Sequence, residues 1–179
     1  TSRWESTRLL GKALIDICGK PMLRRIVDAA YQSTYICEVV VATTPSSEPI
    51  IQYCQDNLIP FYIGDEEDIL GRIYGAAKQS EADIVVRLWG DAPLVESTQI
   101  DAVVEYALSI EDNDYYASLS TKYGVVSIVP FEVLEKLNKE LHDHEARHWI
   151  HKSLDEAKAT VDTQEDLDEV CELWAISER

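Results

Sequence analysis

The stretch Ile84-Val85-Val86-Arg87-Leu88-Trp89-Gly90-Asp91 decides the fold, because an apolar, β-branched run leads directly into a glycine and a carboxylate. Such a continuous run is typical of a strand that is buried on both faces of a sheet. A second run of this kind, Val39-Val40-Val41-Ala42, lies upstream, and Phe61–Ile63 forms a shorter apolar segment between the two. The sequence therefore predicts a sheet with buried strands.

Helical patterns separate these strands. Met22, Leu23, Ile26 and Val27 recur at intervals of three and four residues, which predicts a helix over 21–33 with Pro21 at its start. Further helices are expected over 47–57, 68–79 and 97–109. This alternation of strands and helices indicates an α/β fold with a Rossmann-like, mostly parallel sheet between layers of helices.

The pattern changes beyond residue 113. We expect strands over 114–119 and 125–129 on either side of a turn at Gly124, and then a helix over 130–140. A helix over 144–154, a strand over 158–161 and a closing helix over 164–175 complete the prediction. No repeat or linker interrupts the chain, so residues 1–179 are expected to form one domain with a small β-rich excursion late in the chain.

The charge is distributed unevenly. The chain carries 16 Lys and Arg against 33 Asp and Glu, a net charge of −17, yet its first 25 residues are net positive by four. One basic island on an acidic protein suggests a local anion site, whereas a nucleic-acid surface would need a broad basic face. No apolar run is long enough to span a membrane. Four widely spaced cysteines without a CxxC pair favour reduced thiols, and we expect a cytoplasmic protein.

The island begins in an irregular segment, Thr1-Ser-Arg-Trp-Glu-Ser-Thr-Arg-Leu-Leu-Gly-Lys12. Arg3, Arg8 and Lys12 supply cations, and Ser6 and Gly11 add a hydroxyl and a flexible backbone position. A polyphosphate spreads its charge over many oxygens and needs such cations together with loop amides. A solvated basic loop is the alternative from composition alone.

A doubly wound sheet normally places its first, central strand directly ahead of such an anion-binding loop. Residues 1–12 already read as that loop. Two possibilities stay open on the sequence: a first strand that lies ahead of residue 1, or a sheet that is built differently.

Two aspartates follow predicted strands. Asp91 comes directly after 84–88, and Asp162 comes directly after 158–161. Ligands of open α/β sheets gather at the carboxyl ends of strands, and two carboxylates there could share one Mg²⁺ with phosphate oxygens and water. Each aspartate also has a structural explanation, since Asp162 can cap the last helix and Asp91 can sit in a turn before Pro93.

Six motifs, in this order, resemble the cytidylyltransferase family of the spore-coat-polysaccharide-biosynthesis type. They are Arg-x-x-Ser-Thr-Arg-Leu-x-Gly-Lys, Gly-Lys-Pro-Met-Leu, Val-Val-Val-Ala-Thr-Thr, Gly-Asp-Glu-x-Asp-Ile-Leu-Gly-Arg, Val-Val-Arg-x-x-Gly-Asp-x-Pro-Leu and Val-Asp-Thr-x-Glu-Asp-Leu. Relatives in that family make CMP-activated sugar acids, including CMP-3-deoxy-manno-octulosonate and CMP-acylneuraminate. The resemblance covers nearly the whole chain.

The resemblance implies roles for particular residues. Those of the nucleotide-binding loop would be Arg3, Ser6, Arg8 and Lys12, with Arg3, Lys12 and Asp91 as the catalytic group. Asp91 and Asp162 would be the two Mg²⁺ ligands. Arg72 and Arg87 would lie on the nucleotide or sugar-acid side. Family members are commonly dimers through a late β-rich excursion, which corresponds here to residues 114–150.

The implied reaction is the transfer of CMP from CTP to a sugar hydroxyl with release of pyrophosphate, for surface polysaccharide synthesis. Two alternatives stay open at this point: a sugar-phosphate nucleotidyltransferase with another base specificity, and a nucleotide-binding pseudoenzyme or assembly subunit. A dinucleotide-dependent dehydrogenase is disfavoured because the chain has no GxGxxG motif.

Overall fold

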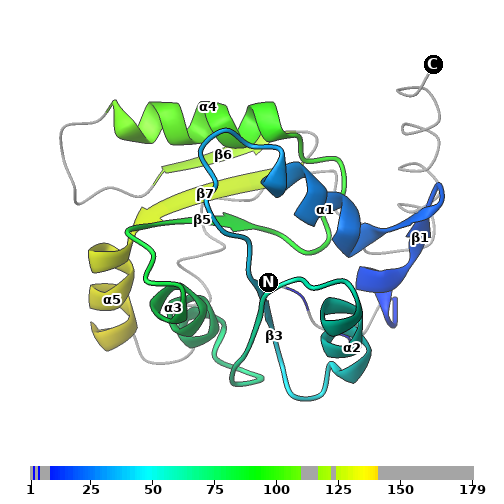
Figure 1. Cartoon of the computed structure of the whole chain (residues 1–179). Helices are drawn as coiled ribbons and strands as arrows, with labels where there is room; N and C mark the ends of the chain where they lie inside the picture. The colour runs from blue at the N-terminus through cyan, green and yellow to red at the C-terminus, as the bar shows by residue number, and fades with distance from the viewer. Residues whose placement is uncertain (1, 3, 5–8, 110–116, 122–123, 141–179) are drawn as a thin grey trace.

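A computed structural model describes residues 2, 4, 9–109, 117–121 and 124–140 of the chain (Figure 1). Short helices and strands alternate along it, as the sequence predicts. In chain order the described elements are η1 (Lys12–Leu14), β1 (Asp16–Ile17), β2 (Lys20–Pro21), α1 (Met22–Tyr31), β3 (Val41–Thr43), α2 (Glu48–Asp56), β4 (Phe61–Ile63), α3 (Ile69–Gln79), β5 (Ile84–Leu88), α4 (Ser97–Leu108), β6 (Ala117–Thr121), β7 (Gly124–Pro130) and α5 (Phe131–Glu140).

Most predicted elements lie where the sequence pattern put them. Strands β4 and β5 have the predicted bounds, and α1 to α5 begin and end within a few residues of the predicted helices. Strand β3 begins at Val41 instead of Val39, because its partner β4 is short and the parallel register starts at Val41 opposite Phe61. The elements predicted over 144–154, 158–161 and 164–175 lie outside the described residues.

The strands fall into separate sheets. β3 pairs with β4 in parallel, whereas β5, β7 and β6 form an antiparallel sheet in that order, and β1 and β2 form a small antiparallel pair. The predicted α/β class is confirmed, but parallel pairing is limited to β3 and β4 in the part of the chain described. The reason is that β7 lies between β5 and β6 and runs opposite to both of them, so both of its pairings are antiparallel.

Three apolar clusters hold these elements together. One joins α1, α4 and β7 through residues such as Ile26, Ile100 and Ile128. A second joins α1 to β3 and α2, and a third packs α3 against β7 and α5. Helices α4 and α1 lie on one side of the β5–β7–β6 sheet, and α3 and α5 lie on the other (Figure 1).

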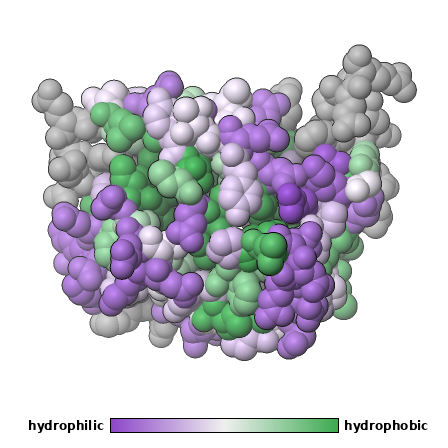
Figure 2. All heavy atoms as spheres, in the orientation of Figure 1, coloured by the Kyte–Doolittle hydropathy of each residue, from purple (hydrophilic) through white to green (hydrophobic). Residues whose placement is uncertain are grey.

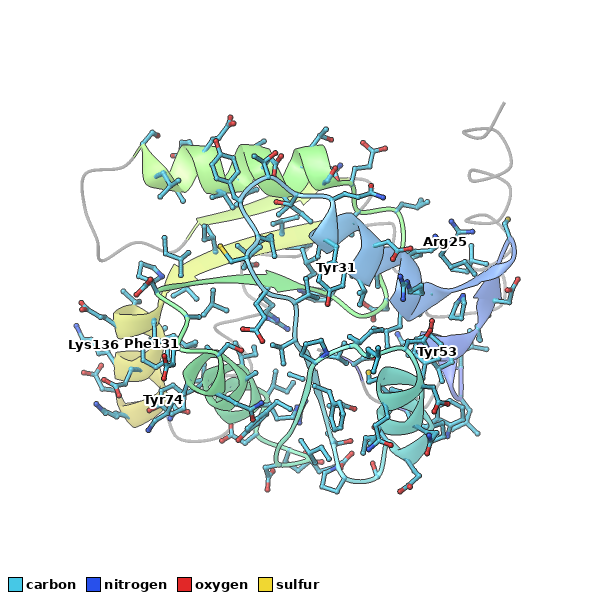
Figure 3. All side chains as sticks on the ribbon, viewed as in Figure 1. Arg25, Tyr31, Tyr53, Tyr74, Phe131 and Lys136 are labelled. Carbon is cyan, nitrogen blue, oxygen red and sulfur yellow. The ribbon has the colours of Figure 1, made fainter. Side chains whose placement is uncertain are left out.

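The contact between α3 and α5 includes an aromatic pair. Tyr74 and Phe131 stack with ring centroids 5.6 Å apart and an interplanar angle of 15° (Figure 3). This stacking holds the first turn of α5 against α3. Across the described residues, no helix has the length and apolar character needed to cross a bilayer.

Candidate functional site

An ion pair joins two residues that the sequence analysis assigned to the same site. The Nζ atom of Lys12 lies 2.7 Å from Oδ2 of Asp91, and the two side chains are 14% and 22% exposed. Lys12 ends the predicted anion-binding loop and Asp91 follows β5, so the fold brings the loop to the carboxyl end of that strand. Because both side chains are partly exposed, a ligand can approach this charge-assisted contact.

The loop reaches this position through a glycine turn. Gly11 has a φ of +66°, which favours glycine, and its N–H donates to the carbonyl of Trp4 at 3.1 Å. A Cβ on Gly11 would lie 2.6 Å from the Trp4 ring. The indole ring and the turn therefore close the loop just before Lys12, and Lys12 opens the short helix η1.

The other end of the loop is fixed to the segment between β3 and α2. The N–H of Trp4 donates to Oγ of Ser47 at 2.9 Å, and Ser47 is fully buried. Ser47 Oγ also lies 2.9 Å from Oγ1 of Thr44. Sequence reasoning missed this anchor, because a serine ahead of a helix looks like an ordinary helix start.

Asp91 is held by the turn that leaves β5. The N–H of Ala92 donates to the carbonyl of Trp89 at 3.4 Å, and Ala92 is buried against Gly124 of β7. A Cβ at Gly124 would lie 2.8 Å from that of Ala92. The close approach of the two segments leaves the Asp91 side chain at the edge of the sheet, pointing to Lys12.

Arg72 has a different environment from the one that the resemblance implies for a ligand-facing residue. Its side chain is only 2% exposed, and Nη1 donates to the carbonyls of Asp65 and Glu66, the latter at 2.9 Å. Backbone N–H groups of Glu67 and Asp68, helped by the Arg72 charge, hold the pKa of the Asp65 carboxyl below its usual range. Arg72 therefore supports the turn that precedes α3.

Arg87 lies on β5, four residues ahead of Asp91 in the chain. Its guanidinium carbon is 5.4 Å from the centre of the Trp89 ring, a cation–π distance. Arg3, Ser6, Arg8 and Asp162 lie outside the described residues. Of the predicted site residues, the structure thus brings Lys12 and Asp91 into contact and shows Arg72 bonded to the carbonyls of Asp65 and Glu66.

Three basic side chains of the first 25 residues form contacts that stabilise the fold. Arg25 donates to the carbonyls of Ile17 and Cys18 in the β1–β2 hairpin, the latter at 3.0 Å (Figure 3). Lys20 and Arg24 contact the two oxygens of Asp28 at 2.7 and 2.6 Å. These three cations therefore bond to nearby groups of the chain. Of the three contacts, the i, i+4 spacing of Arg24 and Asp28 is the signal that the sequence offered.

Asp28 is the acid of that small network. Burial alone would raise its pKa, but the hydrogen bonds and charges of Lys20 and Arg24 together outweigh burial and hold the pKa below its usual value. Its charged form is thus favoured by folding.

The fit of a divalent cation rests on Asp91. Within the ranges that the structure describes, no group of three or more His, Cys, Asp or Glu side chains could hold a metal ion. Magnesium, however, is usually held by one or two carboxylates together with water and phosphate oxygens. Asp91 can supply such a carboxylate if the Lys12 ammonium leaves it and pairs with another anion.

The chain is similar to curated proteins over most of its length. It is 30% identical over 152 residues to an uncharacterized protein of Methanocaldococcus jannaschii, a match that covers 83% of this chain and 62% of that protein. It is 38% identical over 109 residues to a 3-deoxy-manno-octulosonate cytidylyltransferase of Lawsonia intracellularis, covering 58% of this chain and 42% of the relative. The chain thus matches about half of the length of these relatives.

Solved structures share the fold over nearly all of both chains. A cytidylyltransferase from Leptospira borgpetersenii superposes with a TM-score of 0.79 at 22% identity, over 98% of this chain and 92% of that one. CMP:2-keto-3-deoxy-manno-octonic acid synthetase complexed with CTP gives 0.74 at 20% identity, over 98% and 96%. A manganese complex from Mycobacterium tuberculosis gives 0.69 at 15% identity, over 92% and 93%.

A family model described as cytidylyltransferase matches residues 1–165. This range includes the predicted anion-binding loop, the turn after β5 and Asp162. The chain belongs to the cytidylyltransferase family.

Proposed function

We propose that this chain is a Mg²⁺-dependent cytidylyltransferase that transfers CMP from CTP to a sugar acid and releases pyrophosphate, in the synthesis of a surface polysaccharide. The observation that carries the proposal is the 2.7 Å pair of Lys12 and Asp91, which joins a cation of the loop to a carboxylate at the end of β5. The 3-deoxy-manno-octulosonate cytidylyltransferases among the relatives support a sugar acid as acceptor.

In this proposal Lys12 changes its partner when the nucleotide binds. The ammonium group leaves Asp91 and contacts phosphate oxygens of CTP, where it offsets the charge that develops on the departing pyrophosphate. Arg3 and Arg8 would contribute cations from the same loop, and Ser6 a hydroxyl. This exchange replaces one charge-assisted contact with another, so little stabilisation is lost.

The released Asp91 carboxylate, with Asp162, would hold Mg²⁺, which when bound neutralises phosphate oxygens and orients them. The sugar hydroxyl attacks the α-phosphorus and forms the new P–O bond as its proton passes to water, while the bond to pyrophosphate breaks in line and pyrophosphate leaves. The protein accelerates this step by positioning the reactants and by stabilising charge. Arg87 lies on β5, the strand that leads into the turn of Asp91, and it would face the nucleotide or the sugar acid.

The Arg72 contacts favour a supporting role for that residue, and the proposal needs no ligand contact from it. Dimer formation through 114–150 belongs to the proposal as well. It would bring a second copy near the acceptor side, and light scattering on the purified chain measures it.

The test is release of pyrophosphate from CTP in the presence of Mg²⁺ and a panel of sugar acids that includes 3-deoxy-manno-octulosonate. We expect release that depends on the sugar acid and that is lost in the Asp91→Asn variant. Asp56→Asn is the matched control, because Asp56 is an exposed carboxylate on α2 whose described contact is to Gln52. CTP binding without release for any acceptor would favour a binding subunit over an enzyme.

A further inference from the structure

The turn between β3 and α2 carries a row of three hydroxyl groups. The N–H of Ser47 donates to the carbonyl of Thr44 at 3.0 Å, which closes a β-turn with Pro45 at its second position. Thr44 and Ser47 are fully buried, whereas Ser46 is exposed. Oγ1 of Thr44 lies 2.9 Å from Oγ of Ser47 and 3.2 Å from Oγ of Ser46. The Thr44 hydroxyl therefore connects the two serines.

The protons of these hydroxyls can be assigned, because each group has only one. Oγ of Ser46 donates to Oε1 of Glu66 at 2.8 Å, so its bond to Thr44 must use the proton of Thr44. By the same count, Ser47 donates to Thr44. A lone pair of Ser47 then accepts the N–H of Trp4 at 2.9 Å. The row runs in one direction, from the Trp4 amide to the Glu66 carboxylate, and hydrogen bonds in such a row strengthen one another.

Ser47 uses its side chain in an unusual way. It is the N-cap residue of α2, and its carbonyl accepts from the N–H groups of Ile50 and Ile51, yet its side chain makes no capping hydrogen bond. A serine at this position normally accepts from an amide of the first helical turn. Its hydroxyl oxygen accepts instead from Trp4, 43 residues away in the chain. The hydroxyl therefore holds the distant loop and leaves α2 without a side-chain cap.

The turn is a fixed point of the fold. Helix α2 has hydrophilic residues on its outer surface (lower right in Figure 2), and Ile50 and Cys54 are buried on its inner side. The half-buried Trp4 ring packs against the same apolar cluster as these two residues. The loop is thus fastened to one region by its indole ring and by a backbone amide.

Trp4 transmits this attachment to the ion pair of the candidate site. Its N–H donates to Ser47, and its carbonyl accepts from the N–H of Gly11 at 3.1 Å. Lys12 follows directly and pairs with Asp91. The placement of the Lys12 ammonium therefore depends on the position of the Trp4 backbone.

We propose that Thr44 and Ser47 are positioning residues that hold the anion-binding loop ready for the triphosphate of CTP. Ser47 holds the Trp4 amide, and Thr44 acts through Ser47 by accepting its proton. Without that acceptor, Ser47 can turn to cap α2 and release Trp4. The nucleotide must then order the loop as it binds, which lowers its affinity. Glu66 has a smaller share, since water can replace it at the exposed Ser46.

This inference rests on the proposed function, and its test therefore has one arm without nucleotide. Thr44→Val removes the hydroxyl and keeps the branched shape, and Thr44→Ser restores the hydroxyl. Ser33→Ala is the matched control, because Ser33 is a buried hydroxyl that donates to Asp101 of α4. Amide hydrogen exchange of Trp4 without nucleotide, the thermal midpoint, and kcat and KM for CTP are measured in the wild type and in each variant.

We expect Thr44→Val to speed exchange of the Trp4 amide by at least about tenfold and to raise KM for CTP about tenfold. The value of kcat should stay within about twofold, because bound CTP restores the order of the loop. The thermal midpoint should change by less than about 3 °C, since Ser47 gains a partner in α2. Thr44→Ser should match the wild type, and Ser33→Ala should change neither the exchange of Trp4 nor KM.

Unchanged Trp4 exchange in Thr44→Val would overturn the proposal. Faster exchange with an unchanged KM would show that the hydroxyl row serves the fold alone, and an equal rise of KM in Ser33→Ala would assign the effect to a general loss of stability; both results overturn the positioning role. If the wild type neither binds nor turns over CTP, the proposed function fails and the role in CTP binding fails with it. Trp4 exchange then still decides, by itself, whether the hydroxyl row holds the loop.

Discussion

Lys12 and Arg72 form contacts of opposite kinds, although both come from motifs that resemble nucleotide-binding sequences. Lys12 pairs with the side chain of Asp91, a residue far away in the sequence, and both side chains keep some exposure. Arg72 is buried and donates to the backbone carbonyls of Asp65 and Glu66, which lie just ahead of it in the chain. A ligand can replace Asp91 as the partner of Lys12, whereas a ligand that drew the buried Arg72 guanidinium away would remove the donor of two carbonyls.

The largest expected effect is that of Asp91→Asn, which keeps the shape of the side chain and removes its charge. If Asp91 holds the metal, this change should lower kcat/KM about a thousandfold, or about 4 kcal/mol of barrier. The thermal midpoint should change little, because the lost ion pair is partly exposed. Steady-state pyrophosphate release measures the rate, and calorimetric unfolding measures the thermal midpoint. An unchanged rate would show that the contact between Lys12 and Asp91 is not part of the active site.

Arg72→Met should have the converse effect. Removal of the guanidinium leaves two carbonyls without their donor and should lower the free energy of unfolding by about 3 kcal/mol. CTP affinity of the folded protein should stay the same. Urea unfolding and calorimetry test this, with Lys78→Met as the control, since Lys78 is an exposed cation on the same helix. A loss of CTP affinity without a loss of stability would return Arg72 to the ligand site.

Lys12→Met should reduce kcat/KM by about fiftyfold, or about 2.3 kcal/mol. The effect is smaller than that of Asp91→Asn because other cations of the loop would share the triphosphate. If Lys12 and the metal compete for Asp91, as the proposal requires, the same variant should bind Mg²⁺ more tightly in the absence of nucleotide. Calorimetric titration with Mg²⁺ measures this, and weaker binding would contradict the exchange of partners.

Asp28→Asn removes the acid of the Lys20, Arg24 and Asp28 network, for which no ligand is expected. It therefore serves as a reference for the Lys12 and Asp91 pair. Folding lowers the pKa of Asp28. Its contribution to stability is therefore present above the unfolded-state pKa of about 3.9 and is lost as the pH falls through the folded-state value. The variant should lose less than about 1 kcal/mol at neutral pH, with turnover unchanged. Unfolding of both proteins from pH 7 to 2 should show the two curves converging in acid.

The sequence predicted elements whose signal is local. Strand β5 and its flanking helices follow from an apolar run and from helical periodicity, and they lie at or near the predicted positions. The short β1–β2 hairpin was missed, because its turn needs a positive φ at Cys18 as well as at Gly19, and a cysteine gives no signal for that conformation. The division of the described strands into three separate sheets was also missed, since pairing between distant strands cannot be read from either strand alone.

The same limit applies to the candidate site. The motifs placed Lys12 and Asp91 in one site, and the fold brings them into contact. The motifs could not separate Arg72 from Lys12, because burial depends on the packing of α3 against β4 and the 65–68 turn. Nor could composition show that Arg25, Lys20 and Arg24 are committed to the hairpin and to Asp28.

The most direct test of the proposed function is the heat of binding of CTP, UTP, ATP and GTP to the purified chain, with and without Mg²⁺. The account predicts that CTP binds in preference to the other three and that Mg²⁺ strengthens its binding. Equal binding of all four would favour a nucleotidyltransferase of another specificity. Absence of binding for every nucleotide, with the protein folded, would contradict the assignment of Lys12 and Asp91 to a nucleotide site.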